Sequence, residues 1–308
     1  MNKAVFIVLA AVFIASALLL AVLFSFDPGP KATFHLKPDE NTVLFAITPW
    51  GEPRQAREAY MPLLDHLSKK TGKKFQPLVM EGYDVAIENI SDGNLDIAVI
   101  PPVSFVRAKE MEPGIKYIST IERRDGNRTY TTYKAYLIAL SSKYKGWKID
   151  DFLKDPKKFS IAFVTNASSS GWAYPMAMFK KRGVEPSSAF KEVKSFDDHP
   201  SVTNAIAKGQ IDLGATWEYN LEQAVKKHGD IFEIIEVTGN IPGLLWVASK
   251  NVRPELIEQI KKIQAEINSD PELKKELLKD TPDKGWAFLN ESFYDEVREV
   301  LKYVGDFH

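Results

Sequence analysis

The sequence predicts an α/β protein of two lobes, joined by a double crossover like a hinged clamshell and preceded by one N-terminal hydrophobic helix. From Val43 onward, short apolar runs alternate with segments of helical periodicity, which is typical of α/β folds. The alternation restarts after Ser141, which indicates a second lobe. A later apolar strand at 244–248 is assigned back to the first lobe, so we expect the chain to cross near Leu140 and near Val237.

Residues 42–140 are expected to form the first part of the first lobe. Its buried strand at 43–47 is followed by apolar residues at helical spacing up to Gly72, which is a typical helix stop. The remaining elements predicted for this part are a strand at 74–79, a helix at 83–90, a strand at 95–99, a helix from Ser104, and strands near 115–121 and 133–140.

The second lobe is expected at 141–238, and residues 239–308 are expected to return to the first lobe and end in helices. The elements predicted for the second lobe are a strand at 160–164, a helix to about Arg182, a strand near 190–193, a helix from Pro200 to Gly209, a strand at 211–215, a helix near 221–227 and a strand at 231–237. The tail from Pro254 to Val304 carries helical apolar stripes.

The first 26 residues read as a signal peptide or an uncleaved membrane anchor. Ala4 to Phe26 is uncharged, and about 20 apolar residues suffice to span a bilayer, whereas a signal-peptide core is usually ~7–15 residues. A small-residue site at Ala15-Ser16-Ala17 leaves cleavage open. Residues 27–41 then read as a tether. We therefore expect the remainder to be exported, either secreted or held at the outer face of the cytoplasmic membrane by the N-terminal segment.

Composition excludes several classes of function. The chain has 308 residues, a formal net charge of −1 and no basic block, so nucleic acid is not an expected partner. It has no cysteine, which excludes disulfides, thiolate metal sites and a cysteine nucleophile. The five histidines are scattered and indicate no metal site, and no cofactor is expected.

The most informative segment is the serine-rich loop at 165–175, which lies between a strand and a helix. Pro175 has no N–H and fits only the first turn, so the helix is expected to begin near Gly171 or Trp172. Ser168, Ser169 and Ser170 then lie at the helix N-terminus, where free N–H groups and the helix dipole favour an anion. The structural alternative is plain helix capping, for which serine is a preferred residue.

Other candidate residues face the same predicted cleft. Pro200 suits a first helical position, which makes His199 the expected N-cap, and His199 either donates to a ligand or merely caps the helix. Thr48 and Trp50 follow the first strand, so they are expected to line the cleft from the opposite lobe. Glu218 could accept a bond from a protonated ligand oxygen, or be a solvated acid in the first turn of a helix.

These residues resemble the phosphate/phosphite/phosphonate family of periplasmic substrate-binding proteins that serve ABC importers. The resemblance covers about 43–295. Besides the serine loop and His199, it is carried by Asn204-Ala205-Ile206-Ala207, Gln210-Ile211-Asp212, Ile241-Pro242-Gly243 and Gly285-Trp286.

The resemblance implies a type II periplasmic-binding fold and a ligand with a P–O group. It implies that Ser168, Ser169 and Ser170 bind the oxyanion, that His199 is the pocket histidine and that Tyr83 is the first-lobe tyrosine. Glu218 and Tyr219 lie near an acidic ligand position of the family. Two positions depart from the family pattern: Ile100 replaces an aromatic residue and Leu244 replaces an acidic one. These departures disfavour an amino-phosphonate and leave a small tetrahedral oxyanion.

The leading hypothesis is therefore a binding protein, expected as a monomer, that closes on an oxyanion and presents it to an ABC permease. A second hypothesis is an anchored ligand-sensing subunit for a membrane sensor, either a sensor kinase or a chemoreceptor. A third is a serine-dependent phosphohydrolase with His199 as base, although no nucleophile-elbow motif is present.

Overall fold

The structure is a computed structural model that describes residues 39–48, 53–125 and 128–305. The N-terminal helix predicted at 1–26 and most of the tether at 27–41 lie outside these residues. In the part of the chain that is described, no helix combines the length and the apolar character needed to cross a bilayer.

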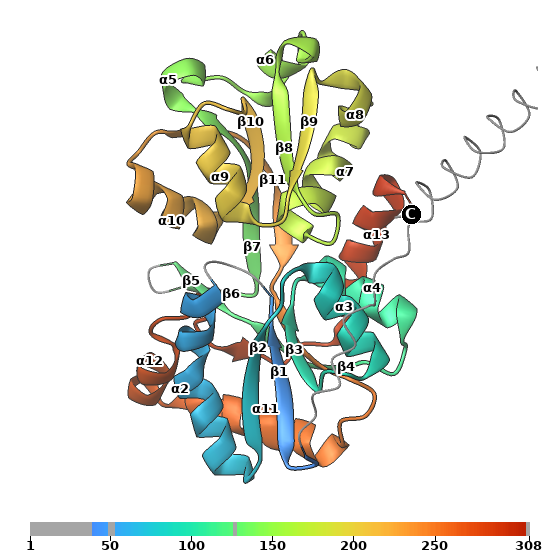
Figure 1. The fold of residues 1–308 in the computed structure, drawn as a ribbon, viewed down its shortest axis with the longest axis vertical. Helices are drawn as coiled ribbons and strands as arrows, with labels where there is room; N and C mark the ends of the chain where they lie inside the picture. The colour runs from blue at the N-terminus through green and yellow to red at the C-terminus, as the bar shows by residue number, and fades with distance from the viewer. Residues whose placement is uncertain (1–38, 49–52, 126–127, 306–308) are drawn as a thin grey trace, which may run out of the picture. The chain divides into compact units, whose positions relative to one another are not determined.

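The first lobe is built on a six-stranded mixed sheet with the order β13-β4-β12-β3-β1-β2 (Figure 1). Its strands are β1 (Thr42–Ile47), β2 (Lys74–Val79), β3 (Ile97–Ile100), β4 (Lys116–Ile121), β12 (Leu245–Ala248) and β13 (Trp286–Ala287). Its helices are α2 (Pro53–Thr71), α3 (Tyr83–Asp92), α4 (Pro102–Met111), α11 (Pro254–Ser269) and α12 (Pro271–Leu278). Strand β1 pairs in parallel with β2 and β3, whereas β12 is antiparallel to both β3 and β4.

The second lobe is built on a five-stranded mixed sheet with the order β11-β7-β10-β8-β9. Its strands are β7 (Thr132–Leu140), β8 (Ser160–Val164), β9 (Glu192–Phe196), β10 (Leu213–Trp217) and β11 (Phe232–Pro242). Its helical segments are α5 (Ser141–Tyr144), α6 (Ile149–Leu153), the short 3₁₀ turn η1 (Pro156–Lys158), the π-helical turn η2 (Ser169–Ala173), α7 (Tyr174–Lys181), α8 (Pro186–Ala189), α9 (His199–Ala207) and α10 (Glu218–His228).

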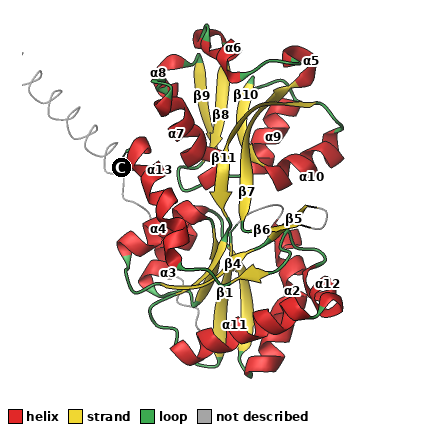
Figure 2. Cartoon of the chain, turned by 180° about the vertical axis from the view of Figure 1, so that it is seen from behind, coloured by secondary structure: helices red, strands yellow, loops and turns green. Residues whose placement is uncertain are grey.

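Strands such as β1 and β8 are largely apolar because helices cover both faces of each sheet. Every residue of β1 and of β8 is buried, and Figure 2 shows helices on both sides of the strands. Strands buried on both faces read as continuous apolar runs, which explains why the sequence pattern located them. Their bounds were less accurate: β9 and β10 each begin two residues later than the strands predicted at 190–193 and 211–215.

The chain crosses between the lobes at different residues from those predicted. The strand near 133–140 was expected in the first lobe, but β7 pairs with β10 and β11 in the second sheet. The first crossing therefore lies between β4 and β7, where β5 (Arg123–Asp125) and β6 (Arg128–Tyr130) form a small hairpin. The second crossing lies between Pro242 and Leu245, and β12 does return to the first sheet as predicted.

The two crossings lie against each other. The N–H of Gly243 donates to the carbonyl of Thr131 at 2.7 Å, and the N–H of Ile121 donates to the carbonyl of Leu244 at 2.7 Å. A Cβ on Gly243 would lie 2.7 Å from the Ile121 carbonyl oxygen and 3.0 Å from that of Thr131. Only glycine fits this close approach of backbones.

The sequence predicted that residues 239–308 return to the first lobe, but the C-terminal region also contacts the second lobe. After β13 and the 3₁₀ turn η3 (Glu291–Tyr294), helix α13 (Asp295–Val304) packs against α4 of the first lobe and α7 of the second. The hydroxyl of Tyr174 donates to Glu296 at 3.3 Å, and the ammonium of Lys180 donates to the carbonyl of Val304 at 3.2 Å. The last helix therefore bridges both lobes.

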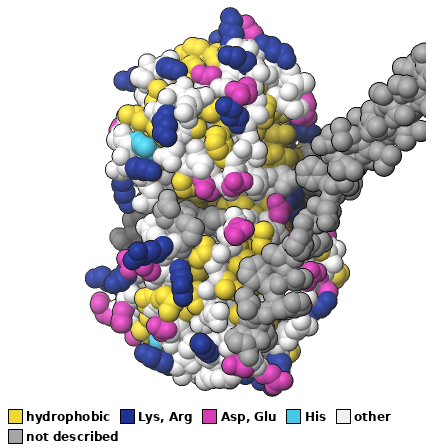
Figure 3. Space-filling view, viewed as in Figure 1, with side chains coloured by type: hydrophobic (Ala, Val, Ile, Leu, Met, Phe, Trp, Pro, Cys, Tyr) yellow, Lys and Arg dark blue, Asp and Glu magenta, His cyan; other side chains and the backbone are white. Residues whose placement is uncertain are grey.

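The surface mixes charges of both signs. Figure 3 shows Lys and Arg side chains interspersed with Asp and Glu over the visible face, and the formal net charge is −1. This face shows no large patch of positive side chains that would attract a polyanion.

Candidate functional site

A small cavity of about 20 Å³ lies between the lobes. Its lining combines hydroxyl, imidazole, indole and apolar groups: Thr48, Tyr83, Pro101, Tyr133, Ser168, Ser170, His199, Trp217 and Leu244. No lysine or arginine is among these lining residues. Direct contacts from these lining residues to a bound anion would therefore come from neutral donors.

Several helices begin at this cavity. Tyr83 is the first residue of α3, Pro101 precedes α4, Ser168 precedes the turn η2 that leads into α7, His199 is the first residue of α9, and Trp217 precedes α10. The first N–H groups of a helix have no partner within the helix, and the dipole adds partial positive charge there. The N-termini of helices from both lobes thus direct partial positive charge toward the cavity, which no cationic side chain lines.

The serine loop forms the N-terminus of its helix two residues earlier than predicted. Ser168 is the N-cap, and its hydroxyl accepts a 3.0 Å hydrogen bond from the N–H of Gly171. The helical conformation begins at Ser169 as a π turn, and Pro175 lies in the first turn of α7. The loop therefore both caps the helix and lines the cavity. Ser168 is the residue that has both roles.

Ser169 differs from its neighbours because it does not line the cavity. Its hydroxyl accepts a 3.0 Å hydrogen bond from the N–H of Val103, in the first turn of α4 in the other lobe. Beside it, the hydroxyl of Ser104 donates to the carbonyl of Ala167 at 3.1 Å. Two hydrogen bonds therefore join the N-terminus of α4 to the serine loop across the interface of the lobes.

Gly171 allows the loop to pass close to the cavity histidine. A Cβ at this position would lie 2.4 and 2.6 Å from side-chain atoms of Val164 and 3.0 Å from Cε1 of His199. A residue with any side chain would force one of these groups to move, so the glycine is part of the geometry of the site.

His199 is not the N-cap of its helix, contrary to the prediction. Asp198 caps α9 by accepting a bond from the N–H of Ser201 at 2.7 Å, so His199 is the first helical residue. The aspartate displaces it from the capping role because its carboxylate reaches the N3 amide. His199 is 3% exposed, and its Nε2 lies 3.5 Å from the hydroxyls of both Ser168 and Ser170.

Burial keeps His199 neutral. It lowers the pKa of the imidazole from its ordinary value to about 3, because a charged ring would lose its hydration. A neutral imidazole offers one donor and one acceptor. A base of such low pKa is also ill suited to take the proton of a serine hydroxyl near neutral pH.

Two tyrosines present neutral phenols to the cavity. Burial raises the pKa of Tyr83, and a hydrogen bond with Ser168 opposes this effect in part. Burial likewise raises the pKa of Tyr133, against hydrogen bonds with Ser170 and Ser169. The sequence reasoning missed Tyr133 because its strand, β7, was assigned to the first lobe.

Thr48 comes from the first lobe, as expected. Its hydroxyl donates to the carbonyl of Val99 at 3.0 Å, so toward the cavity it can only accept a hydrogen bond. Trp50, its predicted neighbour, lies outside the described residues.

Glu218 and Tyr219 do not line this cavity. Strand β10 extends to Trp217, so Trp217 holds the position at the strand end and α10 carries the next two side chains elsewhere. Glu218 accepts a 3.3 Å bond from the N–H of Lys134, burial raises its pKa, and it lines a separate hollow near the first crossing. Tyr219 lines a second hollow between α9 and α10.

Trp217 is the second lining residue that sequence reasoning missed. Its indole N–H is buried and has no hydrogen-bond partner among the described residues. The guanidinium carbon of Arg123 lies 5.0 Å from its ring centroid, which is a cation–π distance. A buried donor without a partner is costly in the free protein and available to a ligand acceptor.

The described residues contain no group of three or more His, Cys, Asp or Glu side chains that could hold a metal ion. The chemistry of the cavity is that of a neutral hydrogen-bonding cradle.

Comparisons with known proteins agree with this geometry. A family model described as "ABC transporter, phosphonate, periplasmic substrate-binding protein" matches residues 45–294. The phosphate-import protein PhnD of Mycolicibacterium smegmatis is 23% identical over 309 residues, which covers 94% of this chain and 93% of that protein.

Two solved structures share the fold. The binding component of an ABC phosphonate transporter from Pseudomonas aeruginosa aligns with a TM-score of 0.77 and 19% identity, covering 85% of this chain and 86% of that one. PhnD1 from Prochlorococcus marinus, solved in complex with methylphosphonate, aligns with a TM-score of 0.74 and 18% identity, covering 85% and 97%. At these identities, the two structures establish the two-lobed periplasmic-binding fold.

Proposed function

The chain belongs to the phosphonate-type family of periplasmic ABC-transporter substrate-binding proteins, and on this premise we propose that it captures a small tetrahedral phosphorus oxyanion between its lobes. The ligand would be phosphate, phosphite or a small phosphonate, delivered to the permease of an ABC importer. The family consists of binding proteins rather than enzymes. This agrees with the low pKa of His199, which makes the imidazole a weak base and so disfavours the phosphohydrolase hypothesis.

The observation that carries the proposal is the convergence of helix N-termini from both lobes on one cavity that no cationic side chain lines. Such N-termini bind phosphate-like groups through free N–H groups and the helix dipole. The hydroxyls of Ser168, Ser170, Tyr83 and Tyr133 and the indole N–H of Trp217 add neutral donors. Each bond from such a donor to an anion contributes about 1.5–3 kcal/mol.

The composition of the cavity supports a small ligand without an amine. Pro101 and Leu244 are apolar, and no carboxylate lines the cavity to pair with an amine. A methyl group fits such walls, whereas the ammonium of an aminoalkyl phosphonate would be buried without a partner.

A thermal-shift panel tests the proposal. Phosphate, phosphite, methylphosphonate, 2-aminoethylphosphonate and sulfate are added separately to the full-length chain. A ligand that binds only the folded state stabilises it by about 2.7 kcal/mol at 100 times its Kd. We expect at least one of the first three to raise Tm and the aminoalkyl compound to give the smallest shift among the phosphorus compounds.

Ser168→Ala supplies the matched variant, because it removes a hydroxyl that lines the cavity. Its Tm shift with the best ligand should be smaller than that of the native chain. If no phosphorus oxyanion raises Tm, the ligand assignment is wrong. Turnover of p-nitrophenyl phosphate at enzymatic rates would instead support the hydrolase hypothesis.

A further inference from the structure

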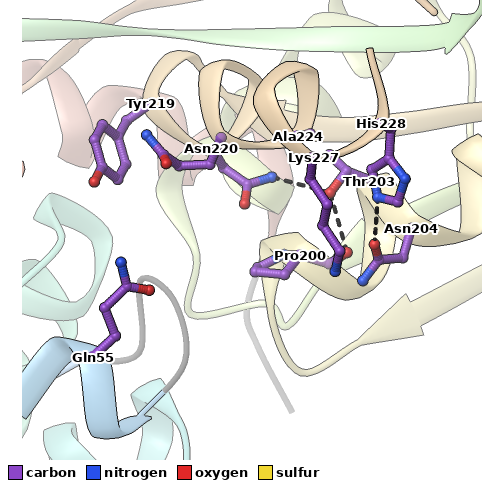
Figure 4. Close-up of a pocket in the computed structure, with 10 residues that line it drawn as sticks. Gln55, Pro200, Thr203, Asn204, Tyr219, Asn220, Ala224, Lys227 and His228 are labelled. Carbon is purple, nitrogen blue, oxygen red and sulfur yellow. Dashed lines mark hydrogen bonds between the residues drawn. The ribbon is translucent and has the colours of Figure 1, made fainter.

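A chain of hydrogen bonds connects His199 to the surface hollow between α9 and α10. This hollow has a volume of about 220 Å³, and Asn204, Asn220 and His228 are among the residues that line it. Figure 4 shows Asn220 on α10 directed toward Thr203 on α9, while Asn204 is bonded to His228. Asn220 itself is 4% exposed.

Thr203 determines which group donates and which accepts in this series of hydrogen bonds. Its hydroxyl lies 3.1 Å from the carbonyl oxygen of Pro200 and 3.3 Å from that of His199. A carbonyl can only accept, so the single hydroxyl proton of Thr203 is used there. The amide of Asn220, 3.4 Å from the same oxygen, must therefore present its N–H side to Thr203.

The same amide nitrogen then sets the role of Thr216. It lies 2.9 Å from the Thr216 hydroxyl oxygen and donates to it with its second N–H. The proton of Thr216 is left for another acceptor, and Nδ1 of His199 lies 3.5 Å from that hydroxyl. Thr216 is fully buried, and Nδ1 is the acceptor that the described residues offer to this proton, so Thr216 donates to Nδ1.

This direction decides which nitrogen of His199 carries the proton. The imidazole is neutral in its buried position, so an Nδ1 that accepts requires an Nε2 that is protonated. Nε2 is the nitrogen that lies between the hydroxyls of Ser168 and Ser170, two residues of the cavity lining.

We propose that Asn220 is a positioning residue of the binding site, which through Thr216 holds His199 as the tautomer protonated at Nε2. His199 then donates to an unprotonated oxygen of the bound oxyanion and disfavours a P–OH group at that point. The inference rests on the proposed function for the ligand, but the tautomer itself is a property of the protein without ligand.

The test is ¹⁵N NMR of the full-length chain labelled at histidine, which distinguishes protonated from unprotonated ring nitrogens. The chain has five histidines, and His199→Gln identifies the signals of His199. In the native chain we expect the pattern of protonated Nε2. Asn220→Leu removes the donor that sets the direction, so both tautomers should appear. Thr216→Val is the second variant. It removes the hydroxyl that bonds to Nδ1 of His199, and it serves as the test if Asn220→Leu does not fold.

Asn204→Leu is the matched control, because Asn204 lines the same hollow but bonds to His228 at 2.7 Å instead. It should leave the signals of His199 unchanged. Methylphosphonate affinity, measured by calorimetry, should fall about twofold in Asn220→Leu and Thr216→Val if the two tautomers become equally populated.

A native His199 protonated at Nδ1 would overturn the inference. So would the native pattern persisting in both variants. If methylphosphonate and the other oxyanions fail to bind the native chain, the proposed function fails separately, and the ligand-free spectra still decide the tautomer.

Discussion

The hydroxyl of Ser169, in the second lobe, accepts a 3.0 Å hydrogen bond from the backbone N–H of Val103, in the first. Val103 lies in the first turn of α4, where N–H groups have no partner within the helix. A side chain of one lobe therefore caps a helix of the other, and it does so only while the lobes are together. Closure of the lobes and capping of α4 are thereby linked.

Ser169→Ala should weaken ligand binding through this link. The N–H of Val103 would lose its partner in the closed state, and loss of a helix cap costs about 0.5–2 kcal/mol. Affinity for methylphosphonate, measured by calorimetry, should fall roughly 2- to 30-fold. Ser187→Ala, at an exposed serine that bonds only within its own turn, is the control. Native affinity in Ser169→Ala would show that this bond does not contribute to closure.

Trp217→Phe should weaken binding while leaving the free protein nearly as stable. The substitution keeps a large ring but removes an indole N–H that has no partner among the described residues. A lost bond to an anion costs about 1.5–3 kcal/mol, or tenfold and more in Kd.

Trp246→Phe is the matched control for this experiment. Its indole N–H is also buried without a partner among the described residues, but it lies in the core of the first lobe and does not line the cavity. Equal effects of the two substitutions on affinity would argue against a role of Trp217 as a ligand donor.

Stability should depend on pH through His199. The pKa of His199 is about 3 in the folded protein and about 6.5 in the unfolded chain. Between these values the unfolded state binds a proton that the folded state does not. The free energy of unfolding should therefore fall as pH decreases from about 6.5 toward 3, by up to about 1.4 kcal/mol per pH unit.

His199→Gln should remove this contribution and flatten the profile. Urea unfolding at several pH values between 7 and 4 measures it, with an unchanged m-value as the check that the transition itself is comparable. Identical slopes for the variant and the native chain would mean that His199 is protonated in the folded state or accessible to water.

Gly171→Ala should displace side chains in and next to the lining of the cavity. The added Cβ would lie 2.4 Å from a methyl of Val164 and 3.0 Å from His199, so one of them must shift. Overpacking of this kind costs about 1–3 kcal/mol, and displacement of His199 should also lower affinity. Thermal unfolding and calorimetry measure both effects. Gly82→Ala, in extended backbone with open space around the new Cβ, is the control and should change neither much.

Gly243→Ala should act at the crossing rather than at the cavity. Its Cβ would meet the carbonyl oxygens of Ile121 and Thr131, and backbone atoms cannot rotate away as a side chain can. We expect a loss of stability of about 1–3 kcal/mol together with altered affinity, because the two crossing segments would be forced apart. A variant with native Tm and native affinity would show that the crossing tolerates this separation.

The sequence located the elements well where the signal was local. The apolar runs that became β1 and β8 were readable because strands covered on both faces carry no polar alternation. The serine loop was readable because capping residues and a first-turn proline mark a helix start within a few positions. The placement of β7 was not readable, since an apolar strand carries no label for the sheet in which it pairs.

The candidate site shows the same division. Ser168, Ser170 and His199 stood out from the sequence, whereas Trp217 was not singled out and Glu218 was chosen from its resemblance to an acidic ligand position of the family. The strand predicted at 211–215 ends two residues before β10 does, so the strand end that Trp217 holds was misplaced. The direction of the bonds from Asn220 to His199 depends on contacts between separate elements, which no local pattern records.

By itself, the sequence determined that this is an α/β protein of two lobes, with hydroxyl groups at a helix N-terminus suited to an oxyanion. Periodicity, capping and turn residues encode these features because they act over a few neighbouring positions. Only the tertiary structure decided that Ser169 caps a helix of the other lobe, that Tyr133 and Trp217 complete the cavity, and that α13 bridges both lobes. Those relations depend on how distant segments pack and share hydrogen bonds, and packing selects one arrangement from many that the same local pattern permits.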